Sequence, residues 1–92
     1  MLYKTITAST QVSTTECYIE GIEFTHDDNA ELKVYDESVG AGVVAKNVCT
    51  VYATGHQRQA SVMFPEPGIK VSGIYAVWTI GTGTIYYHYG GR

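Results

Sequence analysis

Three histidines and two cysteines are the side chains of this sequence that most readily suggest metal binding or catalysis. They are His26, His56, His88, Cys17 and Cys49. Zinc ligands in proteins recur at short, regular spacings, and no pair of these residues has such a spacing. His26 and His56 fall in polar segments typical of turns, and we expect His88 to be a half-exposed residue of a terminal strand. The sequence therefore predicts no metal site.

Carboxylates, serines and glycine-rich loops are the other possible sources of chemistry. The polar run 26–29 is too short for a calcium loop, which spreads its oxygen ligands around a fixed glycine. No Gly-x-Ser-x-Gly motif occurs. The stretch Gly40-Ala41-Gly42 precedes a strand-like run, and not a helix whose N-terminus could bind a phosphate. We expect no catalytic residue, no cofactor and no enzymatic activity.

The two cysteines leave two arrangements open. A single bridge between Cys17 and Cys49 is possible if they lie on adjacent strands, although two cysteines cannot form a disulfide framework. Free cysteine, on the other hand, is among the most buried residue types and packs as a small hydrophobic side chain. Disulfides are also rare in proteins that fold in the cytosol, so the free form is favoured.

Length and charge limit the class of protein. The 92 residues suit a single domain, 1–92, with nine acidic and six basic residues. The basic residues are scattered and form no cluster for nucleic-acid phosphates. No apolar run reaches the roughly 18 residues of a membrane span, and the first residues lack the apolar core of a signal peptide. We expect a soluble protein, made in the cytosol, that binds neither nucleic acid nor membrane.

Short β-type runs alternate with turn residues along the whole chain, as in a β-sandwich or barrel. Strands are predicted at 2–7, 17–24, 32–35, 43–45, 48–52, 61–64, 69–71, 73–80 and 84–89. Within 17–24, the side chains of Tyr18, Ile22 and Phe24 are expected on one face. Helical periodicity is sustained nowhere. The predicted fold is all-β, a small antiparallel β-sandwich, for which a jelly roll is one arrangement.

The last third of the chain has the clearest pattern. Gly81-Thr82-Gly83 predicts a tight hairpin that joins the runs 73–80 and 84–89. The consecutive residues Tyr86 and Tyr87 must point to opposite sides of their strand. At least one of them therefore faces away from the core, unless a partner covers the outer side.

Tyrosine is the one unusual feature of the composition, with eight in the chain. Its ring is apolar and its tip forms hydrogen bonds, which is why it is enriched at protein interfaces. Some of these rings will fill the margins of a small β-core. From their position in the last two strand-like runs, the candidate interface residues are Tyr75, Tyr86, Tyr87 and Tyr89.

The sequence resembles a known class of proteins over nearly its whole length, and four segments carry this resemblance. They are 3–9, 32–36, 68–77 and 81–87. A strand ending in Tyr-Asp precedes a Gly/Ser loop, and a Gly-Ile-Lys…Gly-Ile-Tyr strand leads into Gly-Thr-Gly. The chain thus resembles the small β-domain structural proteins of tailed bacteriophages, which include capsid decoration (cement) proteins. The acidic loop Asp36–Gly40 and the segment Pro65–Pro67 depart from the pattern.

This resemblance implies a virion protein of the capsid surface, synthesised in the host cytoplasm. Such a protein would bind the major capsid protein and stabilise the assembled head as a homo-oligomer, with a trimer favoured. No active-site residues are carried by the resemblance. Two alternatives stay open: a head–tail or fibre-associated virion component, and a carbohydrate-binding β-sandwich that uses exposed tyrosines or Trp78. A sugar platform would need two or three coplanar aromatic rings on one open face.

Overall fold

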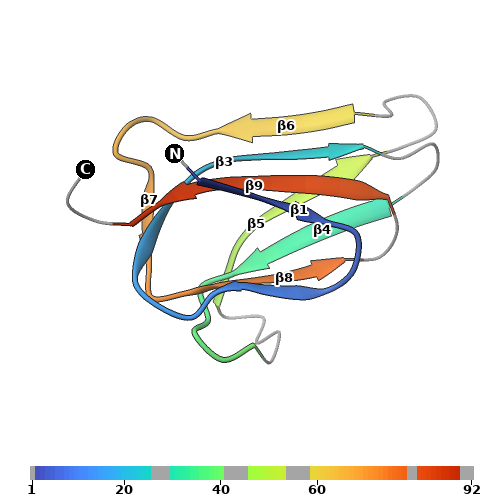
Figure 1. Cartoon of the computed structure of the whole chain (residues 1–92). Coiled ribbons are helices and arrows are strands. Elements are labelled where there is room, and N and C mark those ends of the chain that lie inside the picture. Colours follow the sequence, from blue (N-terminus) through green and yellow to red (C-terminus); the bar gives the residue numbers. More distant parts are fainter. Residues whose placement is uncertain (1, 26–29, 41–45, 54–58, 79–80, 90–92) are drawn as a thin grey trace.

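Two antiparallel sheets pack face to face in this protein (Figure 1). The computed structural model describes residues 2–25, 30–40, 46–53, 59–78 and 81–89. Within them the strands are β1 (Leu2–Ile6), β2 (Thr10–Ser13), β3 (Cys17–Thr25), β4 (Ala30–Tyr35), β5 (Asn47–Ala53), β6 (Gln59–Met63), β7 (Ile69–Val71), β8 (Ile74–Trp78) and β9 (Thr82–His88). The prediction of a small antiparallel β-sandwich is confirmed.

The strand order is that of a jelly roll. Sheet A has the order β1-β9-β3-β6, with β7 also paired to β3, and sheet B has the order β2-β8-β4-β5. Because β6 and β7 follow one another along β3, they act as one interrupted strand. The chain then pairs first strand with last, second with second-to-last, and so on inward to β4 and β5. A ribbon of paired strands wrapped into two sheets in this way is a jelly roll.

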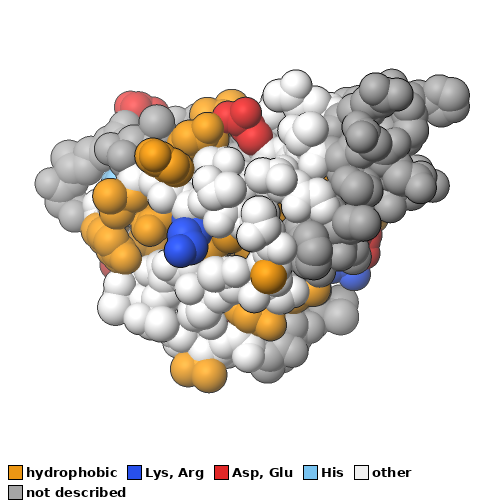
Figure 2. All heavy atoms as spheres, turned by 45° about the vertical axis from the view of Figure 1, so that its right-hand side comes forward, with side chains coloured by type: hydrophobic (Ala, Val, Ile, Leu, Met, Phe, Trp, Pro, Cys, Tyr) orange, Lys and Arg blue, Asp and Glu red, His pale blue; other side chains and the backbone are white. Residues whose placement is uncertain are grey.

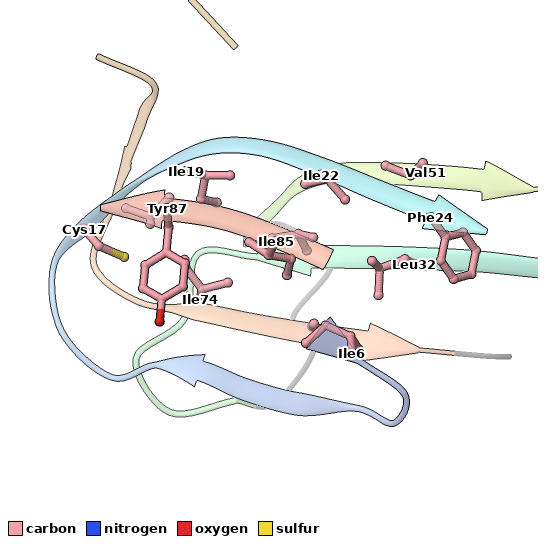
Figure 3. Packing of buried hydrophobic residues seen from close by; sticks show 13 residues of the cluster. Ile6, Cys17, Ile19, Ile22, Phe24, Leu32, Val51, Ile74, Ile85 and Tyr87 are labelled. Atoms are coloured by element: carbon pink, nitrogen blue, oxygen red, sulfur yellow. The ribbon is translucent and has the colours of Figure 1, made fainter. Parts of the chain in front are cut away.

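Alternation along each strand sends its apolar side chains into the space between the sheets (Figure 3). The buried cluster draws on both sheets and consists of Ile6, Cys17, Ile19, Ile22, Phe24, Leu32, Val34, Val51, Val71, Ile74, Ala76, Ile85 and Tyr87. Burial of this apolar core stabilises the packing of the two sheets. The side chains on the outer faces take no part in it, so the two outer faces can differ in composition.

A β-bulge in β3 corrects the predicted face of Tyr18. The register of β3 against β9 shifts between Ile19 and Gly21, so Glu20 is an extra residue. Ile22 and Phe24 are buried, as expected. Tyr18 is paired with His88 and stacks on its ring on the outer side, because the bulge reverses the alternation between the two halves of the strand.

The predicted hairpin at Gly81–Gly83 is wrong. Strand β8 belongs to sheet B and β9 to sheet A, so the two runs are not paired with each other. Gly81 has φ +105°, and it turns the chain from one sheet to the other. Gly83 lies within β9, where a Cβ atom would come 2.7 Å from Leu32 Cδ2. The second glycine therefore allows close packing of the sheets and does not form part of a turn.

Strand β2 was not predicted, because its sequence Thr-Gln-Val-Ser has little apolar content. The predicted strand 43–45 lies outside the described residues, as do His26 and His56. Cys17 and Cys49 are free. They lie on β3 and β5, which belong to different sheets and are not adjacent strands.

Candidate functional site

The described residues offer little for catalysis. No group of three or more His, Cys, Asp or Glu side chains among them could hold a metal ion. Burial raises the pKa of the Cys17 and Cys49 thiols, and at Cys17 a hydrogen bond with Ser13 partly opposes this shift. Both thiols therefore stay protonated at neutral pH, which is the unreactive form. No helix in the described part of the chain is long and apolar enough to span a membrane.

The most distinctive surface is a row of apolar residues across the outer face of sheet A. Four residues are paired in sequence across the sheet, one on each strand. In order across β1, β9, β3 and β6, they are Tyr3, Tyr86, Gly21 and Met63. Directly paired residues point to the same side of a sheet, so these four positions form one line across four strands. We call them the apolar row. Tyr3 and Met63 are 69% and 63% exposed.

Gly21 gives the apolar row its shape. A Cβ atom at this position would lie 2.8 Å from Met63 Cε, so the Met63 side chain lies over the bare backbone of Gly21. On the other side of the row, the rings of Tyr3 and Tyr86 are 6.4 Å apart and tilted by 46°. The row thus combines two tilted rings and a flexible thioether in line across the sheet.

The Glu23 carboxylate borders the apolar row. Its hydrogen bond with the Tyr86 hydroxyl, aided by desolvation, raises the pKa of Tyr86. The hydroxyl is the donor and the Glu23 carboxylate the acceptor. Glu23 itself belongs to the next outward-facing line of the sheet, with Thr84 and Ser61. The apolar row is therefore flanked by a polar line on this side.

A buried polar cluster flanks the apolar row on the other side. His88 Nδ1 lies 3.0 Å from Glu20 Oε2, and the two side chains are only 8% and 12% exposed. The Tyr18 ring stacks on the His88 ring at 5.1 Å with an angle of 8° between them. His88 is therefore buried, and the expectation of a half-exposed residue is wrong. The bulge residue Glu20 supplies the partner that makes this burial possible.

Part of the outer face of sheet B is covered by the chain itself. Tyr35 and Tyr75 pair there across β4 and β8, and Gly40 lies against the Tyr75 ring, where a Cβ would clash with it. At the β5 edge of the same face, Tyr52 pairs with Glu31 and is 61% exposed. The loop that carries Gly40 is held at its start by Asp36, whose Oδ1 accepts hydrogen bonds from the Ser72 amide (2.7 Å) and hydroxyl (2.8 Å). The loop residues 36–40 thus cover the β8 side of this face, around Tyr75.

A second contact holds the same loop. The Gln11 amide donates hydrogen bonds to the carbonyl oxygens of Ser13, Glu37 and Ile74, at 2.8, 2.8 and 2.9 Å. Glu37 is buried. The acidic loop that departs from the phage pattern therefore has a structural role, since it covers Tyr75 on the outer face of sheet B.

The four tyrosines predicted as interface residues do not share one surface. Tyr86 belongs to the apolar row, and Tyr75 lies under the loop on sheet B. Tyr87 is in the core, with its ring directed toward sheet B (Figure 3). Tyr89 is exposed beyond the end of β9, edge-on to Tyr87, with its hydroxyl 3.4 Å from Ser13 Oγ.

Sequence reasoning missed two members of the apolar row. Tyr3 and Met63 lie far from the last strands of the chain, and only the pairing of first strand with last brings Tyr3 beside Tyr86. The one local signal was Gly21, because a glycine inside a strand often marks a bulge or a close approach.

Figure 2 shows hydrophobic side chains exposed in separate groups, with few charged side chains between them.

No family model, no curated protein and no solved structure matches this chain.

Proposed function

We propose that this chain is a non-catalytic structural protein of a tailed-phage virion, which binds the assembled head through the outer face of sheet A. The observation that carries the proposal is the apolar row, in which Tyr3 and Met63 are exposed and Tyr86 is half-buried, in line across Gly21. Exposed apolar patches with polar surroundings are typical of protein interaction sites. On the equivalent face of sheet B, the loop that begins at Asp36 covers Tyr75, and Tyr52 is the exposed ring.

Physical considerations favour docking over catalysis. A domain of this size has a small stability margin, and a partner that binds only the folded form adds to it. Tyrosine loses little conformational freedom when a partner buries it, because its side chain has only two rotatable bonds. Methionine is flexible and adapts its shape to the partner's surface. A rigid sheet that presents such residues is suited to bridging subunits of a larger assembly.

The choice of a phage head as the partner depends on the resemblance of the sequence segments to phage decoration proteins. Jelly rolls are common in viral capsid proteins and in lectins, so the fold is compatible with this choice. Fold alone does not define function. We therefore propose the major capsid protein as the partner and the capsid surface as the location, and a direct binding experiment is needed.

A carbohydrate-binding module is less well supported by the geometry. Sugar rings stack on open, coplanar aromatic faces, whereas Tyr3 and Tyr86 are tilted by 46°. Tyr18 stacks on His88, which covers one side of its ring. These arrangements suit an irregular protein surface better than a flat sugar.

Co-sedimentation with empty shells tests the proposal. The shells would be assembled from the major capsid protein encoded in the same genome. We expect the wild-type chain to sediment with them and Met63→Glu to bind about tenfold more weakly, since it puts a charge into the apolar row. Val39→Glu is the matched control, because Val39 is exposed on the loop over sheet B. Absence of binding to shells, or equal loss in both variants, would contradict the proposal.

A second measurement separates the alternatives. Binding to purified tails but not to shells would indicate the head–tail or fibre-associated component. A change in Trp78 fluorescence on addition of glycans, without binding to shells, would indicate the carbohydrate-binding module.

A further inference from the structure

The edge strands of the two sheets differ in how well they are protected from pairing with another chain. Natural sheets protect their edges with bulges, prolines, short strands and inward-pointing charges. Strand β2 has a bulge between Gln11 and Ser13. The edge formed by β6 and β7 is interrupted by the segment 64–68, which contains Pro65 and Pro67. Strand β5 is paired irregularly opposite Val34 and Tyr35, and it contacts β6 of the other sheet.

Strand β1 has fewer such features. It pairs with β9 in five successive positions without a register shift, from Leu2 to Ile6. Its sequence Leu-Tyr-Lys-Thr-Ile has no proline or glycine and is rich in residues that favour strands. Its first four residues are exposed. Lys4 is the one charge, and it is paired with the buried Ile85, on the inward-facing side of the sheet.

We propose that two copies of this chain associate through β1, with the two β1 strands antiparallel about a two-fold axis at Tyr3. Such an interface is isologous and closes with two subunits. It joins sheet A of one copy to sheet A of the other in a continuous sheet. This inference does not depend on the proposed function, and it differs from the trimer that the phage resemblance implies.

The charge on Lys4 selects the register. An axis at Lys4 would put the two Lys4 ammonium groups directly opposite each other, which is unfavourable. An axis at Thr5 would put Lys4 opposite the buried Ile6 and would leave the two Tyr3 rings apart. An axis at Tyr3 pairs the two Tyr3 rings, and aromatic cross-strand pairs are stabilising.

The same register also covers Leu2. It lies opposite Lys4 of the other copy, and the aliphatic part of a lysine can cover apolar surface while its ammonium group stays in water. Leu2 is 44% exposed in the single chain, so it has apolar area to bury. On the outer face, the two apolar rows meet at Tyr3 and form one line from Met63 of one copy to Met63 of the other.

Light scattering and sedimentation over a range of micromolar concentrations test the association. We expect a species with twice the mass of the 10.1 kDa chain. Tyr3→Lys should give a monomer, because it puts two like charges on the axis. Tyr52→Lys is the matched control: Tyr52 is 61% exposed on the edge strand β5, and this variant should remain a dimer. Circular dichroism would verify that both variants fold.

Cysteine cross-linking tests the register. With oxidised glutathione, Tyr3→Cys should form an interchain disulfide, because residues on the axis face each other at a distance that a disulfide can span. Thr5→Cys should not. The wild-type chain, with its own Cys17 and Cys49, is the background control. A monomer or trimer at all concentrations, dissociation of both lysine variants, or cross-linking of Thr5→Cys in place of Tyr3→Cys would overturn the proposal.

Discussion

The buried pair of Glu20 and His88 is the residue-scale feature with the clearest energetic consequence. His88→Phe keeps a ring to stack on Tyr18 but removes the nitrogen that lies 3.0 Å from Glu20. A buried carboxylate that loses a partner is costly, so we expect a loss of about 2–3 kcal/mol in the free energy of unfolding. Urea denaturation measures this loss.

A double-mutant cycle provides the control for this prediction. In Glu20→Leu/His88→Phe both polar groups are absent, and no buried charge is left behind. The double variant should therefore be more stable than His88→Phe alone. Additive losses from the two single variants would show that Glu20 and His88 do not stabilise one another.

Tyr86 and Glu23 give a prediction on pH. The hydrogen bond with Glu23 raises the pKa of Tyr86 from its ordinary value of 10.0. Because the folded state holds this proton more tightly, the contribution of the pair to stability is complete below pH 10 and is lost as the pH rises through the raised pKa. Glu23→Gln should lower the pKa of Tyr86, as followed by NMR of ring-labelled tyrosine. An unchanged Tyr86 titration would contradict the assignment.

At the scale of elements, the loop after β4 depends on one side chain. Asp36 Oδ1 accepts two hydrogen bonds from Ser72, and the Asp36 amide donates to the Lys46 carbonyl oxygen. Asp36→Ala should cost about 1–2 kcal/mol and should speed hydrogen exchange of the Ser72 amide. Ser72→Ala loses one of the two bonds and should cost about half as much. Equal losses in the two variants would mean that the amide bond contributes nothing.

The elements also show where sequence reasoning succeeds and where it stops. Alternation and turn residues were sufficient to predict most strands and the all-β class, because both are local properties. The bulge at Glu20 was not predicted: Gly21 is a local signal for one, but the register shift is defined only by pairing with β9. The glycines at 81 and 83 have the signature of a hairpin, yet they connect two sheets. Two glycines favour a turn, but whether it joins paired strands or two sheets depends on the strand order of the whole chain.

The candidate surface was less predictable than the fold for the same reason. The apolar row combines residues from the first strand, the last strand and two strands between them. Sequence position suggested four tyrosines close together near the end of the chain, but the jelly roll distributes them among the core, the two outer faces and the end of the sandwich. A surface built from such distant segments requires knowledge of the strand order.

At the scale of the whole molecule, the strand order determines how the chain must fold. Strand β1 pairs with β9 and β2 with β8, so neither sheet is complete before the two ends of the chain have met, although β4 can pair with β5 earlier. Closing such long loops is entropically costly, and proteins dominated by non-local pairing fold slowly. We expect refolding in roughly milliseconds to seconds, measured by stopped-flow fluorescence after dilution from urea. Substitutions at Ile6 or Ile85, where the first and last strands enter the core, should slow refolding if this pairing forms in the transition state. Refolding in microseconds would mean that local contacts control folding despite the jelly-roll order.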